Sequence, residues 1–555
     1  MYQQVYDPVS ESLGLSAIFA VLPLITLFVL LGGLKWSAHW AALSALLVAI
    51  VVALAVYSMP VGQALDSALL GAVFGLFPIM WIVWNAIWIY NMTEATGHFA
   101  VLRRSFGRIS DDQRVQAVII AFCFGALLEA LAGFGTPVAI TAVMLIALGF
   151  QPIKAAAVAL VANTAPVAFG AIAIPIITLG EITGIPKDEL GAMVGRQTPV
   201  LALFVPLILV GMVDGLRGVR QTWPAAIVGG LVFAVAQFAC ANYVSVELTD
   251  IVAALLSTGA IVALLQVWQP SEPIRGEARR QGGPAIAGAA VADPAHEAEV
   301  RRKSDDHKDS RGEILGAYAP YLIIVAVFAL AQVGPLKTFL EGAGTEFGWP
   351  GLDVTDADGE AVSATTFGFS WLSAAGTLLL ISGLLTMIAL KVSPGRAVAV
   401  YAKSLNQLKW ATVTVAAVLA LAYVMNLSGQ TITLGLWIAG AGGILAFLSS
   451  IIGWLGVAVT GSDTSSNSLF GALQVSAARE AGLDPTLLAA ANSSGGVLGK
   501  MISPQNLAIG AAAVGLGGRE GELFRRVFGW SVALLLIMCV LVYLQSTAVL
   551  SWMVV

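Results

Sequence analysis

Charged residues are scarce in this sequence. Asp, Glu, Lys and Arg make up 11% of its 555 residues, whereas soluble domains carry about 25%. Hydrophobic residues make up 58%, and the mean hydropathy is +0.87. Residues 15–34, 37–57 and 527–550 each form an apolar run of the ~20 residues that a helix needs to cross a bilayer. The composition excludes an ordinary soluble domain and predicts an all-α polytopic membrane protein with about 12 transmembrane helices.

The sequence also lacks an excess of positive charge. Its net charge is −5 and its pI is near 5.5, whereas a nucleic-acid-binding domain needs a concentrated basic face. We therefore expect the lipid bilayer, and no nucleic acid, as a partner. The first 14 residues contain no Lys or Arg, so the basic start of a cleaved signal peptide is missing and the first helix is predicted to be retained.

Cysteine is rare, and metal-binding motifs are missing. The three cysteines, Cys123, Cys240 and Cys539, lie singly in apolar runs, with no C-x-x-C spacing. The four histidines form no H-E-x-x-H motif. We expect no metal site and no cofactor.

The placement of Lys and Arg predicts the topology, because these residues concentrate in cytoplasmic loops. The best agreement has the N-terminus outside and residues 269–313, a Gly/Ala/Pro-rich and then charged stretch, inside. This linker joins an N-terminal half, residues 1–268, to a C-terminal half, residues 314–555. The acid-rich segment 335–369 contains a single cation, Lys337. This topology places it outside, where few cations are expected.

Two apolar stretches are interrupted by small polar clusters. Residues 113–150 contain Gly133-Phe134-Gly135-Thr136-Pro137, and residues 443–478 contain Gly461-Ser462-Asp463-Thr464-Ser465-Ser466. We interpret both as re-entrant hairpins. A full span over residues 433–452 would instead put Arg519, Arg525 and Arg526 outside, against the charge rule.

Each predicted hairpin is followed by an apolar helix with a predicted break. Residues 154–179 are interrupted at 163–166, and residues 486–514 at 492–496. From Asn163 and from Asn492 alike, a Gly follows after seven residues and a Pro after twelve. With the predicted topology, these units form an inverted repeat, which is typical of secondary transporters. Chance recurrence in a Gly-rich protein is the alternative.

The breaks supply candidate binding groups for a carboxylate substrate. Irregular backbone within a membrane must line a cavity or be buried in protein, and the start of each half-helix offers amide donors to an anion. The alternative is that these polar groups only cap their own helices. The candidate substrate-binding residues are Thr136, Asn163, Thr164, Thr464, Asn492, Ser493, Lys500 and Ser503.

Three ionisable residues lie within the predicted membrane segments near these breaks. Glu129, among aliphatic residues four positions before the first tip, is the first candidate for a coupling proton, and Asp463 is the second. Each could instead have a structural role, Glu129 in an ion pair and Asp463 as an N-cap. Lys500 could pair with the substrate carboxylate, with Asp463 or with Glu129.

Three blocks of the sequence resemble the bacterial L-lactate permease family. They are Leu128-Glu129-Ala130-Leu131-Ala132-Gly133-Phe134-Gly135-Thr136-Pro137-Val138-Ala139, Thr460-Gly461-Ser462-Asp463-Thr464-Ser465-Ser466-Asn467 and Gly499-Lys500-Met501-Ile502-Ser503-Pro504-Gln505. The resemblance covers nearly the whole chain, although the 269–313 linker looks longer and more charged than is usual there. It implies import of L-lactate, D-lactate and glycolate across the bacterial cytoplasmic membrane with a proton as the coupling ion, and a possible homodimer.

Three other functions remain open at this stage. Hydroxyl- and amide-rich breaks also suit a sodium-coupled carboxylate carrier. Ser503 and Lys500, three residues apart, could form the Ser/Lys pair of an intramembrane hydrolase, although capping explains Ser503 better. A channel is the third alternative, but the inverted repeat favours a transporter, not an enzyme or a channel.

Overall fold

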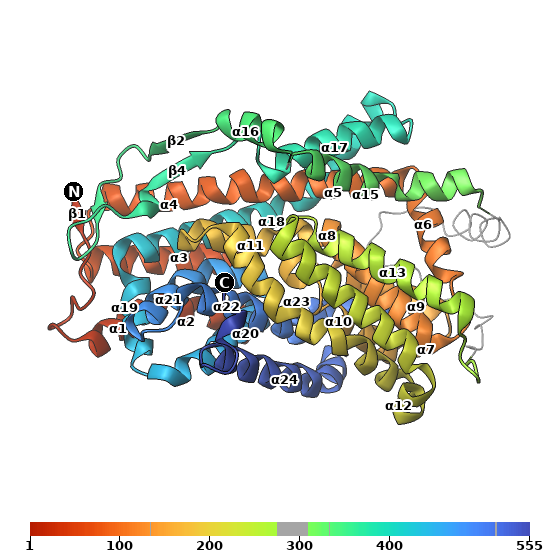
Figure 1. The fold of residues 1–555 in the computed structure, drawn as a ribbon. Coiled ribbons are helices and arrows are strands. Elements are labelled where there is room, and N and C mark those ends of the chain that lie inside the picture. The colour runs from red at the N-terminus through yellow and green to blue at the C-terminus, as the bar shows by residue number, and fades with distance from the viewer. Residues whose placement is uncertain (134, 275–308, 332, 517–518) are drawn as a thin grey trace.

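The computed structural model describes residues 1–133, 135–274, 309–331, 333–516 and 519–555. These residues are mostly helical, as the composition predicts (Figure 1). Most of the predicted linker, residues 269–313, and Phe134 of the first tip lie outside the described residues.

The first helices confirm the apolar runs at the start of the chain. Residues 13–33 form one span, and α3 forms the next. The third span, Val61–Ala95, is longer, and it bends where Phe77 leaves helical geometry before Pro78. The elements are α1 (Leu13–Ala20), α2 (Leu22–Phe28), η1 (Val29–Gly33), α3 (Ala38–Ala55), α4 (Val61–Phe74), η2 (Gly75–Met80), α5 (Trp81–Ala95) and α6 (His98–Gly107).

The first predicted hairpin is a pair of packed helical arms. Its first arm consists of α7 (Gln113–Gln116), η3 (Ala117–Phe124) and α8 (Gly125–Ala132), and its second is α9 (Thr136–Ala147). The next helix is broken as predicted: α10 (Pro152–Ala162) ends before a turn, and η4 (Val167–Phe169) and α11 (Gly170–Thr183) continue at an angle of 64°.

Long helices follow on either side of the linker. A break at Asp214 and Gly215 divides α12 into two arms, each longer than the ~20 residues that a crossing needs. The elements here are α12 (Lys187–Tyr243), α13 (Thr249–Val267), α15 (Arg311–Ala331), α16 (Gly334–Gly342), η5 (Ser363–Thr365), α17 (Ala375–Ala389) and α18 (Pro394–Ser428).

The second hairpin repeats the arrangement of two packed arms, α20 and α21. The helix preceding it ends at Ala439, so residues 433–452 are not one continuous helix. The remaining elements are α19 (Gln430–Ala439), η6 (Gly442–Ile444), α20 (Leu445–Thr460), α21 (Asp463–Glu480), α22 (Pro485–Gly499), η7 (Lys500–Ile502), α23 (Pro504–Ala513), α24 (Glu520–Gln545) and η8 (Ser551–Met553).

The position predicted for the second break was wrong. Residues 492–496 are helical, α22 continues to Gly499, and the helix breaks at Lys500–Ser503. The small residues instead allow two helices to pack closely. Gly453 of α20 lies against the carbonyl of Asn492, and Gly495 of α22 lies against that of Ser450, so the two backbones are in contact. Small residues at such crossings let membrane helices approach closely.

Ten helices of the described chain are long and apolar enough to span a membrane, or eleven if α10 and α11 count as one bent span. This number is close to the estimate of about 12, but it includes residues 113–132 and 442–460, the first arms of the two predicted hairpins. The window in residues 113–132 is 100% buried, whereas that in residues 13–33 is 33% buried. The first arm of the first hairpin thus lies inside the bundle, and the first span lies at its surface.

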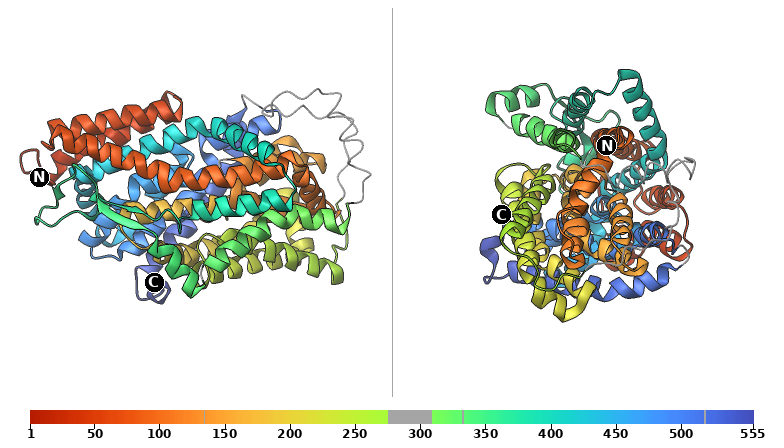
Figure 2. Two further views of the ribbon diagram at one scale, coloured as in Figure 1. Left: turned by 90° about the horizontal axis from the view of Figure 1, so that it is seen from above. Right: turned by 90° about the vertical axis from the view of Figure 1, so that its right-hand side faces the viewer.

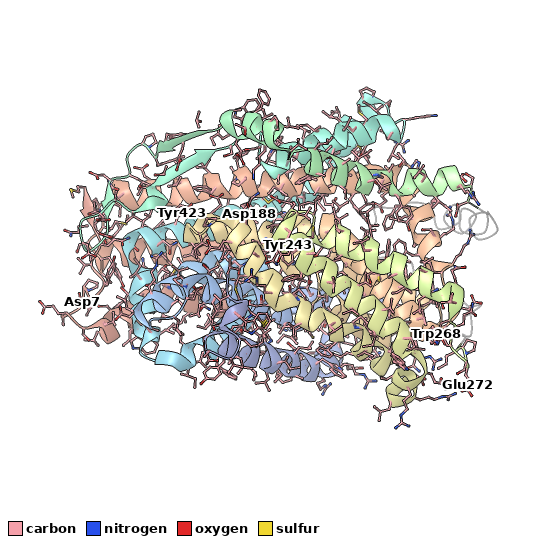
Figure 3. All side chains as sticks on the ribbon, viewed as in Figure 1. Asp7, Asp188, Tyr243, Trp268, Glu272 and Tyr423 are labelled. Atoms are coloured by element: carbon pink, nitrogen blue, oxygen red, sulfur yellow. The ribbon has the colours of Figure 1, made fainter. Side chains whose placement is uncertain are left out.

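The two ends of the bundle are formed by different parts of the chain. The N-terminus, α1 and α19 lie at one end, whereas α6, α7 and the bend of α12 lie at the other (Figure 1). The end-on view in Figure 2 shows α15 to α17 along one edge and α24 along the opposite edge. Asp7 and Glu272 mark the two ends in Figure 3.

The described chain contains four short strands, all near the acidic segment 335–369. Strand β1 (Tyr2–Gln3) pairs in parallel with β3 (Val354–Thr355), with Tyr2 opposite Val354. Strand β2 (Thr345–Gly348) pairs antiparallel with β4 (Thr366–Phe369). The N-terminus and the acidic segment therefore lie on one side of the protein, as the topology requires.

The other end is held by a buried arginine. Arg114 is fully buried and donates to Asp112 at 2.8 Å, to Asp214 at 3.1 Å and to Gln221 at 2.5 Å. It also donates to the carbonyl of Glu272 at 2.8 Å. One side chain thus ties the first hairpin to the bend of α12 and to the chain after α13.

The close contact of α20 and α22 predicts the effect of Gly453→Ala. The added methyl group would meet the carbonyl of Asn492, and overpacking of this kind costs about 1–3 kcal/mol. We expect a lower apparent melting temperature in detergent. Gly443→Ala is the control, because its methyl group meets nothing within 4 Å. Equal melting of the two variants would contradict the backbone contact.

Candidate transport site

A buried ion pair joins the two halves of the chain. Glu129 on α8 is 2% exposed, and its Oε1 accepts a hydrogen bond from Lys500 Nζ at 2.6 Å. Its Oε2 accepts from Asn163 Nδ2 at 2.9 Å. Of the three partners that the sequence leaves open for Lys500, the structure shows Glu129. The first hairpin, the first break and the second break therefore meet at this carboxylate.

Glycine and strained backbone make room for Glu129. A Cβ at Gly170 would lie 2.9 Å from Glu129 Oε1. The next residues, Ala171 to Ala173, have φ values of 46°, 58° and 56°, which cost about 1–3 kcal/mol each in non-glycine residues. Gly133, with φ of 43°, ends α8 beside Ala171. Strain of this kind persists where packing over-determines it, often at functional sites.

Asp463 forms a second buried acidic position close by. Its Oδ2 accepts from Ser493 Oγ at 2.6 Å, and its Oδ1 lies against Gly496 and has no hydrogen-bond partner among the described residues. The positive charge of Lys500 acts on it. The N-cap of α21 is Ser462, whose side chain accepts from Ser465 N. Asp463 is therefore not the cap, which was one interpretation of the sequence.

Asn492 belongs to a network of amides rather than to the ion pair. It donates to Asn467 Oδ1 at 2.9 Å and accepts from Gln474 Nε2 at 3.3 Å. Asn467 in turn donates to the carbonyl of Pro175 in α11 at 3.0 Å. This network joins the second hairpin to the first broken helix.

Ser503 caps α23, which is the structural role that the sequence analysis gave as the alternative to substrate binding. Its hydroxyl accepts from Asn506 N at 3.3 Å and donates to the backbone carbonyl of Lys500 at 3.0 Å. It makes no hydrogen bond to the Lys500 amine, which is directed to Glu129. The arrangement lacks the contact that a Ser/Lys nucleophile needs.

The three candidate threonines are placed differently. Thr164, in the turn after α10, donates to the carbonyl of Val161 near the end of that helix at 2.8 Å. Thr136 and Thr464, just after the two tips, are partly buried. Their hydroxyls make no hydrogen bond within the described part of the chain. Both are therefore available to a ligand.

Asn506 is a residue of the site that the sequence analysis missed. Its Nδ2 donates to the carbonyl of Gly461 at the second tip at 3.3 Å. A Cβ at Gly135, in the first tip, would lie 3.3 Å from its Oδ1. Both tips therefore meet at α23. The sequence contained one signal for this residue: Asn506 is a polar residue in an apolar segment, three residues after Ser503 and next to Gln505.

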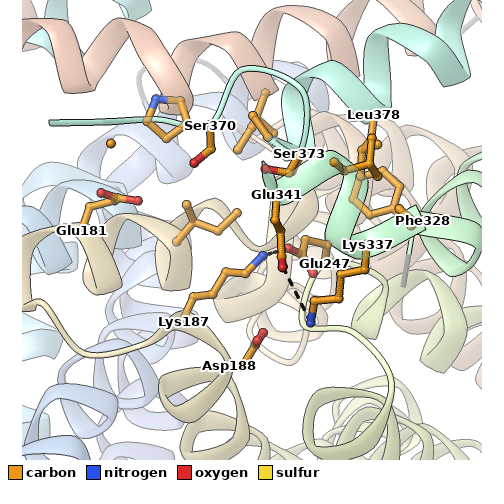
Figure 4. A pocket seen from close by; sticks show the side chains of 18 of the residues that line it. Glu181, Lys187, Asp188, Glu247, Phe328, Lys337, Glu341, Ser370, Ser373 and Leu378 are labelled. Carbon is orange, nitrogen blue, oxygen red and sulfur yellow. Dashed lines mark hydrogen bonds and ion pairs between the residues drawn. The ribbon is translucent and has the colours of Figure 1, made fainter. Parts of the chain in front are cut away.

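A cavity of about 310 Å³ lies elsewhere, between the α11–α12 junction and the α16–α17 segment. Figure 4 shows Lys187 paired with Glu247, and Lys337 beside Glu341 at 3.9 Å. Glu181 and Asp188 also line it. Four acidic and two basic side chains favour cations over anions here. The pKa of Glu247, in the loop before α13, is lowered by Lys187 although burial opposes this.

These observations define a polytopic α-helical membrane protein whose two hairpins and two broken helices surround a buried ion pair. A sequence profile of the family described as L-lactate permease matches residues 16–549. The chain therefore belongs to the L-lactate permease family, whose members are transporters.

Individual relatives are similar over the whole chain. The glycolate permease GlcA of Escherichia coli is 41% identical over 98% of both chains. The L-lactate permease of the same organism is 41% identical over 100% of both chains. Among solved structures, that of Neisseria gonorrhoeae MtrF, from a class of antimetabolite efflux pumps, has a TM-score of 0.46 and 16% identity, covering 88% of this chain and 85% of that one.

The buried pair predicts a non-additive effect of two substitutions. Lys500→Met leaves the Glu129 carboxylate without its partner, and such a loss costs about 3–5 kcal/mol. Adding Glu129→Gln removes the uncompensated charge, so the double variant is expected to regain stability. The readout is the apparent melting temperature in detergent, with exposed Lys403→Met as the control. Additive losses would contradict the ion pair.

Proposed function

We propose that this protein imports L-lactate and related 2-hydroxy-monocarboxylates, including D-lactate and glycolate, by proton symport across the bacterial cytoplasmic membrane. The names of its relatives support L-lactate and glycolate as substrates. The observation that carries the coupling mechanism is the Glu129–Lys500 pair. A buried carboxylate held only by a cation and an amide is poised to exchange that cation for a proton.

The substrate carboxylate replaces Glu129 at the Lys500 ammonium in this proposal. Glu129 then loses its cation inside protein, where an unpaired carboxylate is costly, and takes up a proton. The bound state holds Lys500 paired with lactate beside a neutral Glu129. One proton enters with each monocarboxylate, and the site gains no net charge.

Neighbouring donors account for the preference for a small hydroxy acid. Asn163 Nδ2, which binds Glu129 in this state, can also donate to the incoming substrate. The hydroxyls of Thr136 and Thr464 can bind a 2-hydroxyl group. The N-terminus of α9 adds backbone amides that favour an anion.

Transport requires the site to face each side in turn, and the two hairpin units are the proposed moving parts. In this proposal the N-terminus is outside and the linker is cytoplasmic. The buried Arg114 cluster at the linker end of the bundle supports this orientation, because Lys and Arg accumulate on the cytoplasmic side.

Uptake of radiolabelled lactate into proteoliposomes tests the proposal, with a proton gradient or a sodium gradient imposed separately. We expect the proton gradient alone to drive accumulation. Glu129→Gln, which mimics the protonated side chain, is expected to abolish this accumulation while lactate counterflow continues.

Exposed Glu360→Gln serves as the matched control and is expected to behave like the unmodified protein. Uptake that needs sodium would overturn the coupling ion. Normal proton-driven accumulation by Glu129→Gln would exclude Glu129 as the proton site.

A further inference from the structure

A second acid in the N-terminal half is buried without a cation. Asp250 lies in the first turn of α13 and is 0% exposed. Its Oδ1 accepts one hydrogen bond, from Gln237 Nε2 at 3.2 Å, and its Oδ2 has no partner among the described residues. Asp250 lies in the first turn of α13 but makes no capping hydrogen bond there.

Gln237 ties Asp250 to the first broken helix. The same Nε2 donates to the carbonyl of Ala165, within the turn between α10 and η4, at 3.2 Å. Its Oε1 accepts from Thr198 Oγ1 at 3.4 Å. Gln237 thus holds the carboxyl group of Asp250 beside the turn that follows Asn163.

Asp250 and Glu129 lie on neighbouring helices, because α13 packs against α8. No cation in the described ranges forms an ion pair with Asp250. The titratable groups on the elements that pack against α13 include Cys123 of η3, Glu129 of α8, Glu181 of α11, Lys187, Arg196 and Cys240 of α12, and Tyr321 of α15.

The two acids therefore differ in their partners. Glu129 is paired with Lys500, whereas an ionised Asp250 would be an uncompensated charge in a low-dielectric interior. A buried acid in that situation keeps its proton. Membrane-embedded acids of this kind are usually functional.

We propose that Asp250 is a second proton-carrying residue, which passes its proton to Glu129 when the substrate takes Lys500. The O–H bond of Asp250 breaks, an O–H bond forms on Glu129, and the Asp250 carboxylate then takes up a proton from the external solution. Glu247, three residues earlier, lines the cavity of Figure 4, and this cavity is the proposed route by which the proton approaches Asp250. The sum remains one proton per substrate.

This inference rests on proton coupling at Glu129, so its test separates the two. Asp250→Asn keeps the shape and the hydrogen bond to Gln237 but cannot release a proton. We expect lactate counterflow in proteoliposomes to stay within about twofold of the unmodified protein, whereas proton-driven uptake falls about 100-fold, the scale of a lost proton-transfer group. Exposed Asp358→Asn is the matched control.

Three outcomes would overturn one proposal or the other. Normal proton-driven uptake by Asp250→Asn means that Asp250 only accepts a hydrogen bond, and the inference fails. Loss of counterflow as well would make Asp250 a binding or folding residue, which also contradicts it. If the unmodified protein shows no proton-driven uptake, the proposed function itself fails.

Discussion

The ion pair between Glu129 and Lys500 is the interaction on which the arrangement of the core depends. Its partners lie 371 residues apart, one before the first hairpin tip and one at the second helix break. Removing either partner leaves a charge buried in protein, which costs more than the pair contributes. The pair therefore keeps the two units together for as long as no other ion competes for Lys500.

The surrounding backbone is arranged to allow such competition. Gly170 lets the chain approach Glu129, and the left-handed Ala171 to Ala173 follow it at once. Asn506 contacts both hairpin tips, so a movement of α23 would change the contacts at each of them. The amide network of Asn467, Asn492 and Gln474 links the units independently of charge. A substrate that releases the ion pair thus leaves this second link between the two units in place.

The sequence predicts the charged part of the site better than the polar part. Glu129 and Lys500 stand out because charged residues inside apolar segments are costly, and their pairing was among the alternatives. The first break is found because Pro166 ends a helical run. The second was misplaced because Asn492 to Gly496 resemble a break, although their small side chains serve helix packing. Asp250 was missed because an acid in a first helical turn is ordinary.

The central claim is that lactate binding moves a proton onto Glu129. Infrared difference spectroscopy of the purified protein, recorded on addition of lactate, observes this directly through the carbonyl stretch of a protonated carboxyl group. A new protonated-carboxyl band that is missing in Glu129→Gln is the result that we predict. Lactate binding without such a band, or with the same band in the variant, would contradict the exchange at Lys500.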